Sequence, residues 1–325
     1  MIQNNSLPQP LTKVLLAPLA GISSLDYRLL NRRFGCKFAC LEMISARSLS
    51  YQSKKTLEMM KTNQEDRPLG LQLLGENPKY ILKALEYLDE YPFDILDFNA
   101  ACPIKKVTNH GKGAALLKEP KKLSSLLKLM VKNSSKPVTL KMRLGWDSPK
   151  DAVETAQMAE DSGISALCVH GRTRFQKYQL PLDYESIKKI KKSISIPLIA
   201  SGEIWGGQTA KKMFEETGCD AITVARGSLG NPWIFKEIES FLDRGDIIAR
   251  PKIEEISQAI KTHMDLMIEH QGEKNAIIKF RKFFIWYTKG LRNIKPLRAE
   301  ASLARKRQDI IYLNEKLIAQ AADSS

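Results

Sequence analysis

Short runs of apolar residues recur along the first two thirds of the chain, and amphipathic stretches separate them. Each run is nearly continuous in its hydrophobicity, which is typical of parallel strands buried on both faces. The eight runs cover residues 13–21, 38–45, 69–75, 95–101, 138–145, 166–173, 197–205 and 221–229. The intervening stretches repeat apolar residues with the helical period, as in 79–91, 122–134 and 151–163. This alternation predicts that each strand is followed by a helix.

Eight strand–helix units within about 250 residues predict an α/β fold of the (β/α)8 TIM-barrel type. A doubly wound open sheet is the rival fold for the same alternation. It is disfavoured because no G-x-G-x-x-G signature of dinucleotide-binding sheets follows the first run. In a barrel, the residues that carry chemistry stand at the carboxyl ends of the strands.

The pattern changes after about residue 250, where helical periodicity continues without strands. Three stretches, 253–272, 274–291 and 297–321, are predicted to be helical. We therefore expect two domains, a barrel over residues 1–245 and an all-helical domain over residues 252–325. They are joined by the segment RGDIIARPK.

Composition excludes several classes of protein. No apolar run reaches the 18 to 20 or so residues of a membrane span, and the first 13 residues lack the features of a signal peptide. The five cysteines form no disulfide framework, and the C-x3-C pair at Cys36 and Cys40 has no second pair or nearby histidine for zinc. We expect a cytoplasmic protein without a metal or an obligate protein partner.

The net charge of +15 points to an anionic partner, with nucleic acid as the leading candidate and a generally basic proteome as the alternative. The distribution of this charge along the chain favours a nucleic-acid partner. From Lys274 to Arg307 there are eleven Lys and Arg residues and a single acidic one, Glu300, so that this segment of 34 residues carries +10. Five aromatic residues between 280 and 287 are interleaved with these cations, and we expect most of those rings to form the core face of a helix.

Residues suited to binding a phosphorylated cofactor gather where the predicted strands end. Glycine-containing turns follow the seventh run (residues 201–203) and the eighth (225–227). In a barrel, such turns present backbone N–H groups to a phosphate, and Arg226 adds charge. Lys141 and Gln72 offer donors to the electron-rich edge of a flat heterocycle. These residues favour a phosphorylated planar cofactor, and flavin mononucleotide (FMN) fits that description.

The segment NAACPIKKVTNHGKGAALL, residues 99–117, places a thiol, lysines and glycines directly after the fourth strand. A thiol at Cys102 above a flavin can deliver a proton while the flavin delivers a hydride, and together they reduce a carbon–carbon double bond. Each feature also has a purely structural explanation: a turn glycine, a small buried thiol, or a core histidine at His170. The functional interpretation gains weight because all of these residues fall at the same end of the barrel.

Five motifs, in this order, resemble those of the tRNA-dihydrouridine synthases, particularly the bacterial branch called DusB-like. The motifs are LAPLAGISSLDYR, NAACPIKKVTNHGKGAALLKEP, HGRTRFQKY, RGSLGNPWIF and RKFFIWYTKGL. The resemblance covers nearly the whole chain. It implies a flavin-dependent reduction of uridine to dihydrouridine in tRNA, with NADPH reducing the FMN.

The resemblance also implies roles for individual residues. Cys102 would give a proton to C5 of the uracil, while the flavin gives a hydride to C6. The residues that would contact the flavin are Pro18, Leu19, Ala20, Gln72, Lys141, His170, Ser201, Gly202, Glu203, Ala225 and Arg226. Asn99, Lys106, Arg143, Arg172 and Arg174 would lie near the uridine or its phosphates. In the helical domain, we expect Lys289, Arg292, Lys295 and Arg298 to bind tRNA phosphates because of the local charge.

Two other functions are compatible with parts of this pattern. One is an FMN barrel that acts on a free pyrimidine, similar to dihydroorotate dehydrogenase, although a small substrate does not require a basic helical domain. The other is an inactive barrel retained for RNA binding, which the presence of Cys102, Lys141 and His170 argues against. Purified protein would be yellow in the first case and colourless in the second.

Overall fold

The computed structural model describes residue 7 and residues 12–322. Most of the first 13 residues, which lack signal-peptide features, lie outside the described residues. The first residues of the expected barrel domain and the last residues of the expected helical domain also lie outside them. Among the helices of the described residues, none is long and apolar enough to cross a membrane.

A closed barrel of parallel strands forms the larger part of the molecule, as the apolar runs predict. The strands are β1 (Val14–Leu16), β2 (Ala39–Cys40), β3 (Ile44–Ser45), β4 (Leu69–Leu74), β5 (Ile95–Ala100), β6 (Val138–Arg143), β7 (Ala166–His170), β8 (Leu198–Ser201) and β9 (Ala221–Val224). The first strand pairs with the last, with Val14 opposite Ile222, and this pairing closes the barrel. The second apolar run, expected as one strand, is divided into β2 and β3, which share one position in the barrel because both pair with β4.

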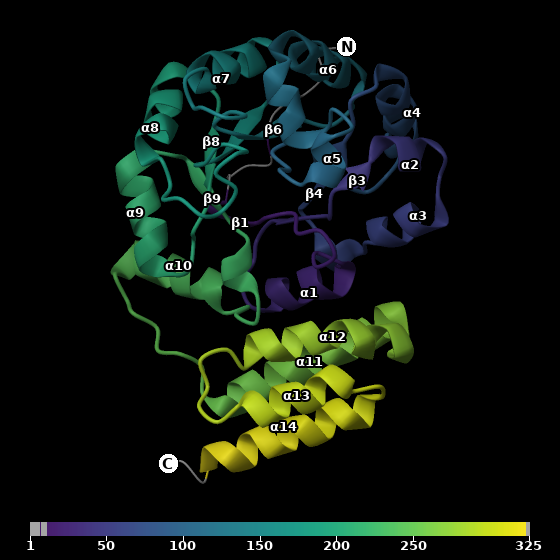
Figure 1. The fold of residues 1–325 in the computed structure, drawn as a ribbon, viewed down its shortest axis with the longest axis vertical. Helices are drawn as coiled ribbons and strands as arrows, with labels where there is room; N and C mark the ends of the chain where they lie inside the picture. The colour runs from purple at the N-terminus through teal and green to yellow at the C-terminus, as the bar shows by residue number, and fades with distance from the viewer. Residues whose placement is uncertain (1–6, 8–11, 323–325) are drawn as a thin grey trace.

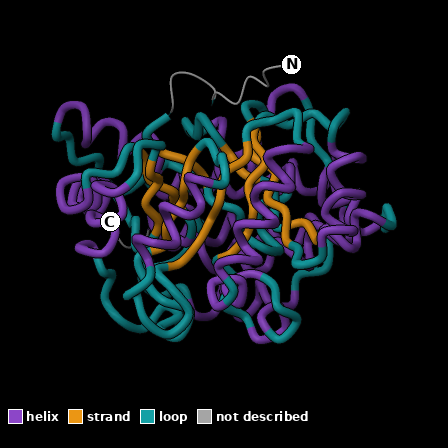
Figure 2. Tube along the Cα trace, turned by 90° about the horizontal axis from the view of Figure 1, so that it is seen from above, coloured by secondary structure: helices purple, strands orange, loops and turns teal. Residues whose placement is uncertain are grey.

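Helices surround the ring of strands (Figures 1 and 2). They are α1 (Leu25–Arg33), α2 (Ala46–Ser50), α3 (Lys54–Met60), α4 (Pro78–Leu88), α5 (Lys105–Thr108), α6 (Pro120–Asn133), α7 (Ala152–Asp161), α8 (Tyr184–Ser193), α9 (Gly207–Thr217) and α10 (Ile234–Arg244). Local sequence sets their boundaries. At the start of α4, for example, the Asn77 side chain accepts a hydrogen bond from the Lys79 N–H at 2.9 Å, and Pro78 occupies the first helical position.

The C-terminal part is a bundle of four helices (Figure 1): α11 (Ile253–Gln271), α12 (Glu273–Tyr287), α13 (Lys295–Leu303) and α14 (Arg307–Ala322). The stretch expected to be helical over 297–321 contains a break between α13 and α14. Asp309 stabilises the break by accepting hydrogen bonds from the backbone N–H groups of Arg305 and Lys306, at 2.7 and 3.0 Å. Four aromatic rings of α12 are buried in the bundle core, as expected: Phe280, Phe283, Phe284 and Tyr287.

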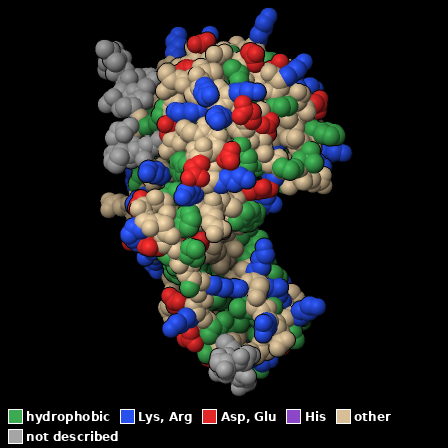
Figure 3. All heavy atoms as spheres, turned by 90° about the vertical axis from the view of Figure 1, so that its left-hand side faces the viewer, with side chains coloured by type: hydrophobic (Ala, Val, Ile, Leu, Met, Phe, Trp, Pro, Cys, Tyr) green, Lys and Arg blue, Asp and Glu red, His purple; other side chains and the backbone are tan. Residues whose placement is uncertain are grey.

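The bundle packs against the barrel mainly through α1, and a recess separates the two bodies on one side (Figure 3). Tyr27 of α1 stacks on Phe283 with ring centroids 5.7 Å apart, and Gln271 donates to Asp26 at 2.7 Å. The ammonium group of Lys282 donates to the carbonyl oxygen of Gly21 at 2.6 Å. Helix α12 therefore contacts the loop that follows β1.

The two bodies approach each other closely at Gly230. A Cβ atom there would lie 2.2 Å from the carbonyl carbon of Trp286 and 2.4 Å from the nitrogen of Tyr287, and Gly230 has φ +67°. We expect Gly230→Ala to lower the free energy of unfolding by about 1–3 kcal/mol, because backbone must move to make room. Thermal unfolding, with limited proteolysis between residues 245 and 252, measures the effect.

Gly218→Ala is the matched control for this prediction. Gly218 has φ +68°, but its Cβ would meet nothing within 4 Å. Both variants therefore place a side chain on a glycine with positive φ, but only Gly230→Ala also brings a Cβ against the backbone of α12. Equal losses of stability in both would contradict a specific role of the close approach at Gly230.

Candidate active site

The barrel interior is apolar at one end and polar at the other. Residues of the same parity along a strand point inward, so that β5 contributes Ile95, Asp97 and Asn99 in turn. Leu15, Phe38, Ile95, Ala166, Cys168, Ile199 and Ala221 form the apolar end. In the polar part, Asp97 lies opposite Gln72 on β4 and Thr139 on β6. This layer lies toward the carboxyl ends of the strands, where a barrel builds its active site.

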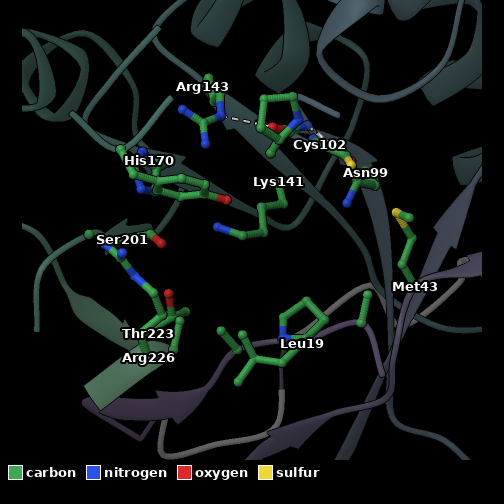
Figure 4. A pocket seen from close by; sticks show the side chains of 18 of the residues that line it. Leu19, Met43, Asn99, Cys102, Lys141, Arg143, His170, Ser201, Thr223 and Arg226 are labelled. Atoms are coloured by element: carbon green, nitrogen blue, oxygen red, sulfur yellow. Dashed lines mark hydrogen bonds between the residues drawn. The ribbon is translucent and has the colours of Figure 1, made fainter. Parts of the chain in front are cut away.

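A cavity of about 230 Å³ opens above this layer. All eleven residues expected to contact a flavin line it, as do Cys102, Asn99 and Arg143. Lys141 extends into the middle of the space, with Cys102 and Asn99 on one side and Leu19 on another (Figure 4). Residues far apart in the sequence thus meet around one cavity.

Turns after β8 and β9 form a tight wall of this cavity. Gly202 has φ +132°, a conformation that favours glycine, and its Cβ would lie 2.6 Å from Leu182. A Cβ at Gly227 would lie 2.2 Å from the carbonyl oxygen of Ile204. Arg226 is exposed beside them. The packing of these turns therefore requires glycine at both positions, and a positive charge is available on the same wall of the cavity.

Two titratable side chains point into the cavity from β6 and β7. The ammonium group of Lys141 donates to the thiol of Cys168 at 3.3 Å. Burial lowers the pKa of His170 well below its ordinary value, and the charges of Arg143 and Lys141 lower it further. His170 is consequently neutral at physiological pH. Within the described residues, its buried Nδ1 atom has no hydrogen-bond partner.

Asn99 organises the turn that carries Cys102. Its side-chain oxygen accepts hydrogen bonds from the backbone N–H groups of Ala101 and Cys102, at 3.1 and 2.9 Å. The Cys102 carbonyl in turn accepts from the Ala114 N–H at 3.1 Å. Burial raises the pKa of the Cys102 thiol, while Ile104 and Arg143 lower it by a smaller amount. The thiol therefore retains its proton at neutral pH.

The comparison with protein families agrees with this geometry. The model of the family described as dihydrouridine synthase (Dus) matches residues 15–323. The chain belongs to the dihydrouridine synthase family.

Curated relatives of similar length extend the match. The chain is 34% identical over 309 residues to the probable tRNA-dihydrouridine synthase of Rickettsia bellii, with 94% of each chain covered. It is 37% identical to tRNA-dihydrouridine synthase B of Vibrio vulnificus, over 85% of this chain and 86% of the relative.

Solved structures at low identity share the barrel fold with this dihydrouridine synthase family member. Histamine dehydrogenase from Rhizobium sp. 4-9 aligns with a TM-score of 0.55 at 11% identity, over 78% of this chain and 49% of that one. This chain thus spans about half of that protein. The old yellow enzyme homologue from Zymomonas mobilis aligns with a TM-score of 0.51 at 14% identity, over 75% and 92% of the two chains.

Two arginines expected near the substrate in this dihydrouridine synthase family member are buried and already bonded. Arg143 donates to the carbonyl oxygens of Ala101, Thr173 and Lys177, each at 2.9 Å. Arg172 is 1% exposed and pairs with Glu203. Both guanidinium groups hold loops around the cavity, so neither is free to reach an RNA phosphate in this conformation.

The other expected RNA contacts differ in exposure. Arg174 is half-buried, with its guanidinium 4.3 Å from the centre of the Trp146 ring, whereas Lys106 is exposed on α5. Lys289, Arg292 and Lys295 are exposed at the turn between α12 and α13. Arg298 is half-buried and donates to the Thr288 hydroxyl at 3.1 Å, so it attaches α13 to the end of α12.

Several lining residues were not singled out from the sequence. Met43 comes from the short segment between β2 and β3, and Trp205 follows β8. Tyr178 lies between two cations, with its ring centre 5.1 Å from the Arg143 guanidinium and 4.9 Å from that of Arg226. Tyr178 is the last residue of the motif HGRTRFQKY, and this position could have identified it as a candidate site residue. Among the described residues, no group of three or more His, Cys, Asp or Glu could hold a metal ion.

Proposed function

We propose that this protein reduces the C5–C6 double bond of specific uridines in tRNA, with bound FMN as the cofactor and NADPH as the reductant. The observation that carries the proposal is the position of the Cys102 thiol. It lines the same cavity as Lys141, His170 and the glycine turns after β8 and β9. The tRNA substrate follows from membership of the dihydrouridine synthase family.

The cavity wall fits FMN on three counts. The turns at Gly202 and Gly227 line the cavity without side chains that would cover their backbone, and Arg226 lies beside them, which suits a phosphate. The Lys141 ammonium contacts only a weak thiol acceptor in the described residues, so it is available to the electron-rich edge of the flavin ring. The buried Nδ1 of His170 lacks a protein partner in the same part of the chain.

The remaining lining residues would hold the cofactor through backbone and short side chains. When bound, the flavin supplies the hydride that it has received from NADPH to C6 of the uracil. The Cys102 thiol holds the proton destined for C5, and Asn99 fixes the turn that presents it. Ile104 and Tyr178 line the cavity and are also exposed, which places them at its opening.

A uridine within folded tRNA cannot reach this cavity without leaving its stack. The base must be extruded, as in other enzymes that modify bases inside folded nucleic acids. The exposed cations Lys289, Arg292 and Lys295 would bind the backbone of the tRNA while the base enters the cavity.

Identification of the cofactor and the product tests this function. Heat should release FMN, recognised by mass and fluorescence, and NADPH should bleach the flavin absorbance. The reduced protein should then form dihydrouridine in unmodified tRNA, and tRNA from cells that lack the gene should lose dihydrouridine at the same positions. Release of flavin adenine dinucleotide, or turnover of a free pyrimidine in place of tRNA, would contradict the proposal.

A further inference from the structure

A chain of hydrogen bonds runs from a buried carboxylate to the Cys102 turn. Asp97 is 7% exposed, and its two oxygens accept from the Thr139 hydroxyl and the Gln72 amide, each at 2.7 Å. The Gln72 oxygen then accepts from the Asn99 amide at 2.7 Å. The Asn99 oxygen finally accepts from the backbone N–H groups at the Cys102 turn.

The direction of these bonds is fixed at both ends. The backbone N–H groups of Ala101 and Cys102 can only donate, so the Asn99 oxygen must face them. The Asn99 amide nitrogen must then face Gln72, and the Gln72 amide nitrogen must face Asp97. The group that faces the Gln72 nitrogen must accept a hydrogen bond, and a carboxylate can do so. This requirement explains why a buried position holds an acidic residue.

We propose that Asp97 is a positioning residue for Cys102, and that its carboxylate sets the direction of the hydrogen bonds through Gln72 and Asn99. This inference deepens the proposed function and rests on it for the role of Cys102. Asp97 does not itself line the cavity above the polar layer. It acts through two amides on the backbone that presents the thiol.

An apolar substitution breaks the chain at its acidic end. In Asp97→Leu, the Gln72 amide nitrogen loses the acceptor that it has in the original protein, and it cannot turn to Asn99, which presents its own amide nitrogen to Gln72. Gln72 is then no longer held in place against Asn99, and the Asn99 side chain is free to turn away from the backbone N–H groups.

A double variant tests whether Asp97 acts through Gln72. Gln72→Leu removes the amide that connects Asp97 to Asn99. If Asp97 acts only through this amide, the Asp97→Leu, Gln72→Leu double variant should lose no more protection than Gln72→Leu alone. Additive losses would mean that the two residues act separately.

Hydrogen exchange of the Ala101 and Cys102 amides tests this inference, measured at pH 7.5 on the full chain without tRNA or NADPH. Burial raises the pKa of Asp97 to about 6, so the carboxylate is ionised under these conditions. We expect exchange in each single variant to accelerate about tenfold or more, as for the loss of an ordinary hydrogen bond. The double variant should exchange within about threefold of the Gln72→Leu rate.

Thr139→Val provides the control, since it removes the other hydrogen bond to Asp97 without changing the direction of the chain. Its exchange at Ala101 and Cys102 should stay near the original rate, even where thermal unfolding shows lower stability. Unchanged protection in Asp97→Leu, or additive losses in the double variant, would overturn the inference. Since the readout needs no turnover, a failure of the proposed function would leave these results unaltered.

Discussion

Replacing Cys102 with alanine is expected to slow the reduction of uridine in tRNA by about a hundredfold or more, the typical cost of losing a general acid. Flavin content and NADPH oxidation by the flavin should change little, because the residues expected to contact the flavin are other residues of the cavity. Burial raises the pKa of this thiol, so the proton is present at neutral pH in the original protein. Single-turnover reduction with a pre-reduced flavin measures the step.

The pH dependence of that step provides a second measurement. The protonated thiol is the active form, so the rate should be constant on the acidic side of the Cys102 pKa and fall as the pH rises through it. Cys219→Ala is the control, because Cys219 is a buried thiol at the opposite end of the barrel strands. Turnover of Cys102→Ala at the original rate would assign the proton to another group.

Reversing three exposed charges in the bundle is expected to weaken tRNA binding about a hundredfold at moderate salt. The variant is Lys289→Glu, Arg292→Glu, Lys295→Glu. Each cation that neutralises a phosphate releases counterions, so the slope of log affinity against log salt should fall by about three. Arg298 is excluded because it donates to the Thr288 hydroxyl and supports the fold. Filter binding at several salt concentrations measures both quantities.

A variant with the same change in net charge separates local contacts from general attraction. Lys188, Lys189 and Lys192 are exposed on α8 of the barrel, and their reversal to glutamate is the control. Flavin spectrum and NADPH oxidation should survive in both variants. If both lose affinity equally, overall charge governs binding. If neither does, the loops around Lys105, Lys106 and Arg174 carry recognition.

The barrel could be predicted because its signal is local and repeated. The division of the second strand could not, since it depends on Glu42 in the middle of an apolar run. This carboxylate is 8% exposed and accepts a hydrogen bond from the Gly21 N–H, a contact between distant segments. The break before α14 also lacks a glycine or proline signal. There, Arg281 of α12 donates to the Ala304 carbonyl at 2.9 Å.

The residues around the cavity could be predicted from the sequence because the strand ends meet at one edge of a barrel. The hydrogen-bond and ion-pair partners of the charged side chains could not be predicted. Arg143 and Arg172 were expected near the uridine or its phosphates, and the sequence could not show that carbonyl groups of distant loops and Glu203 hold them inside. Asp97 was detectable in principle, because it stands two residues before Asn99 and hence faces inward. Its role depends on Gln72, which is 25 residues away.

The pairing of β1 with β9 also governs when the cavity can exist during synthesis. Pro18 to Ala20 follow β1, whereas Ala225 to Gly227 follow β9, and both groups line the same wall. A nascent chain that ends before Ala221 can pair β1 with β2 only, so the barrel is not closed, and it lacks the second glycine turn. The cavity is therefore complete only after about two thirds of the polypeptide has left the ribosome. The helical bundle emerges after that point, so the complete cavity precedes the surface expected to bind tRNA.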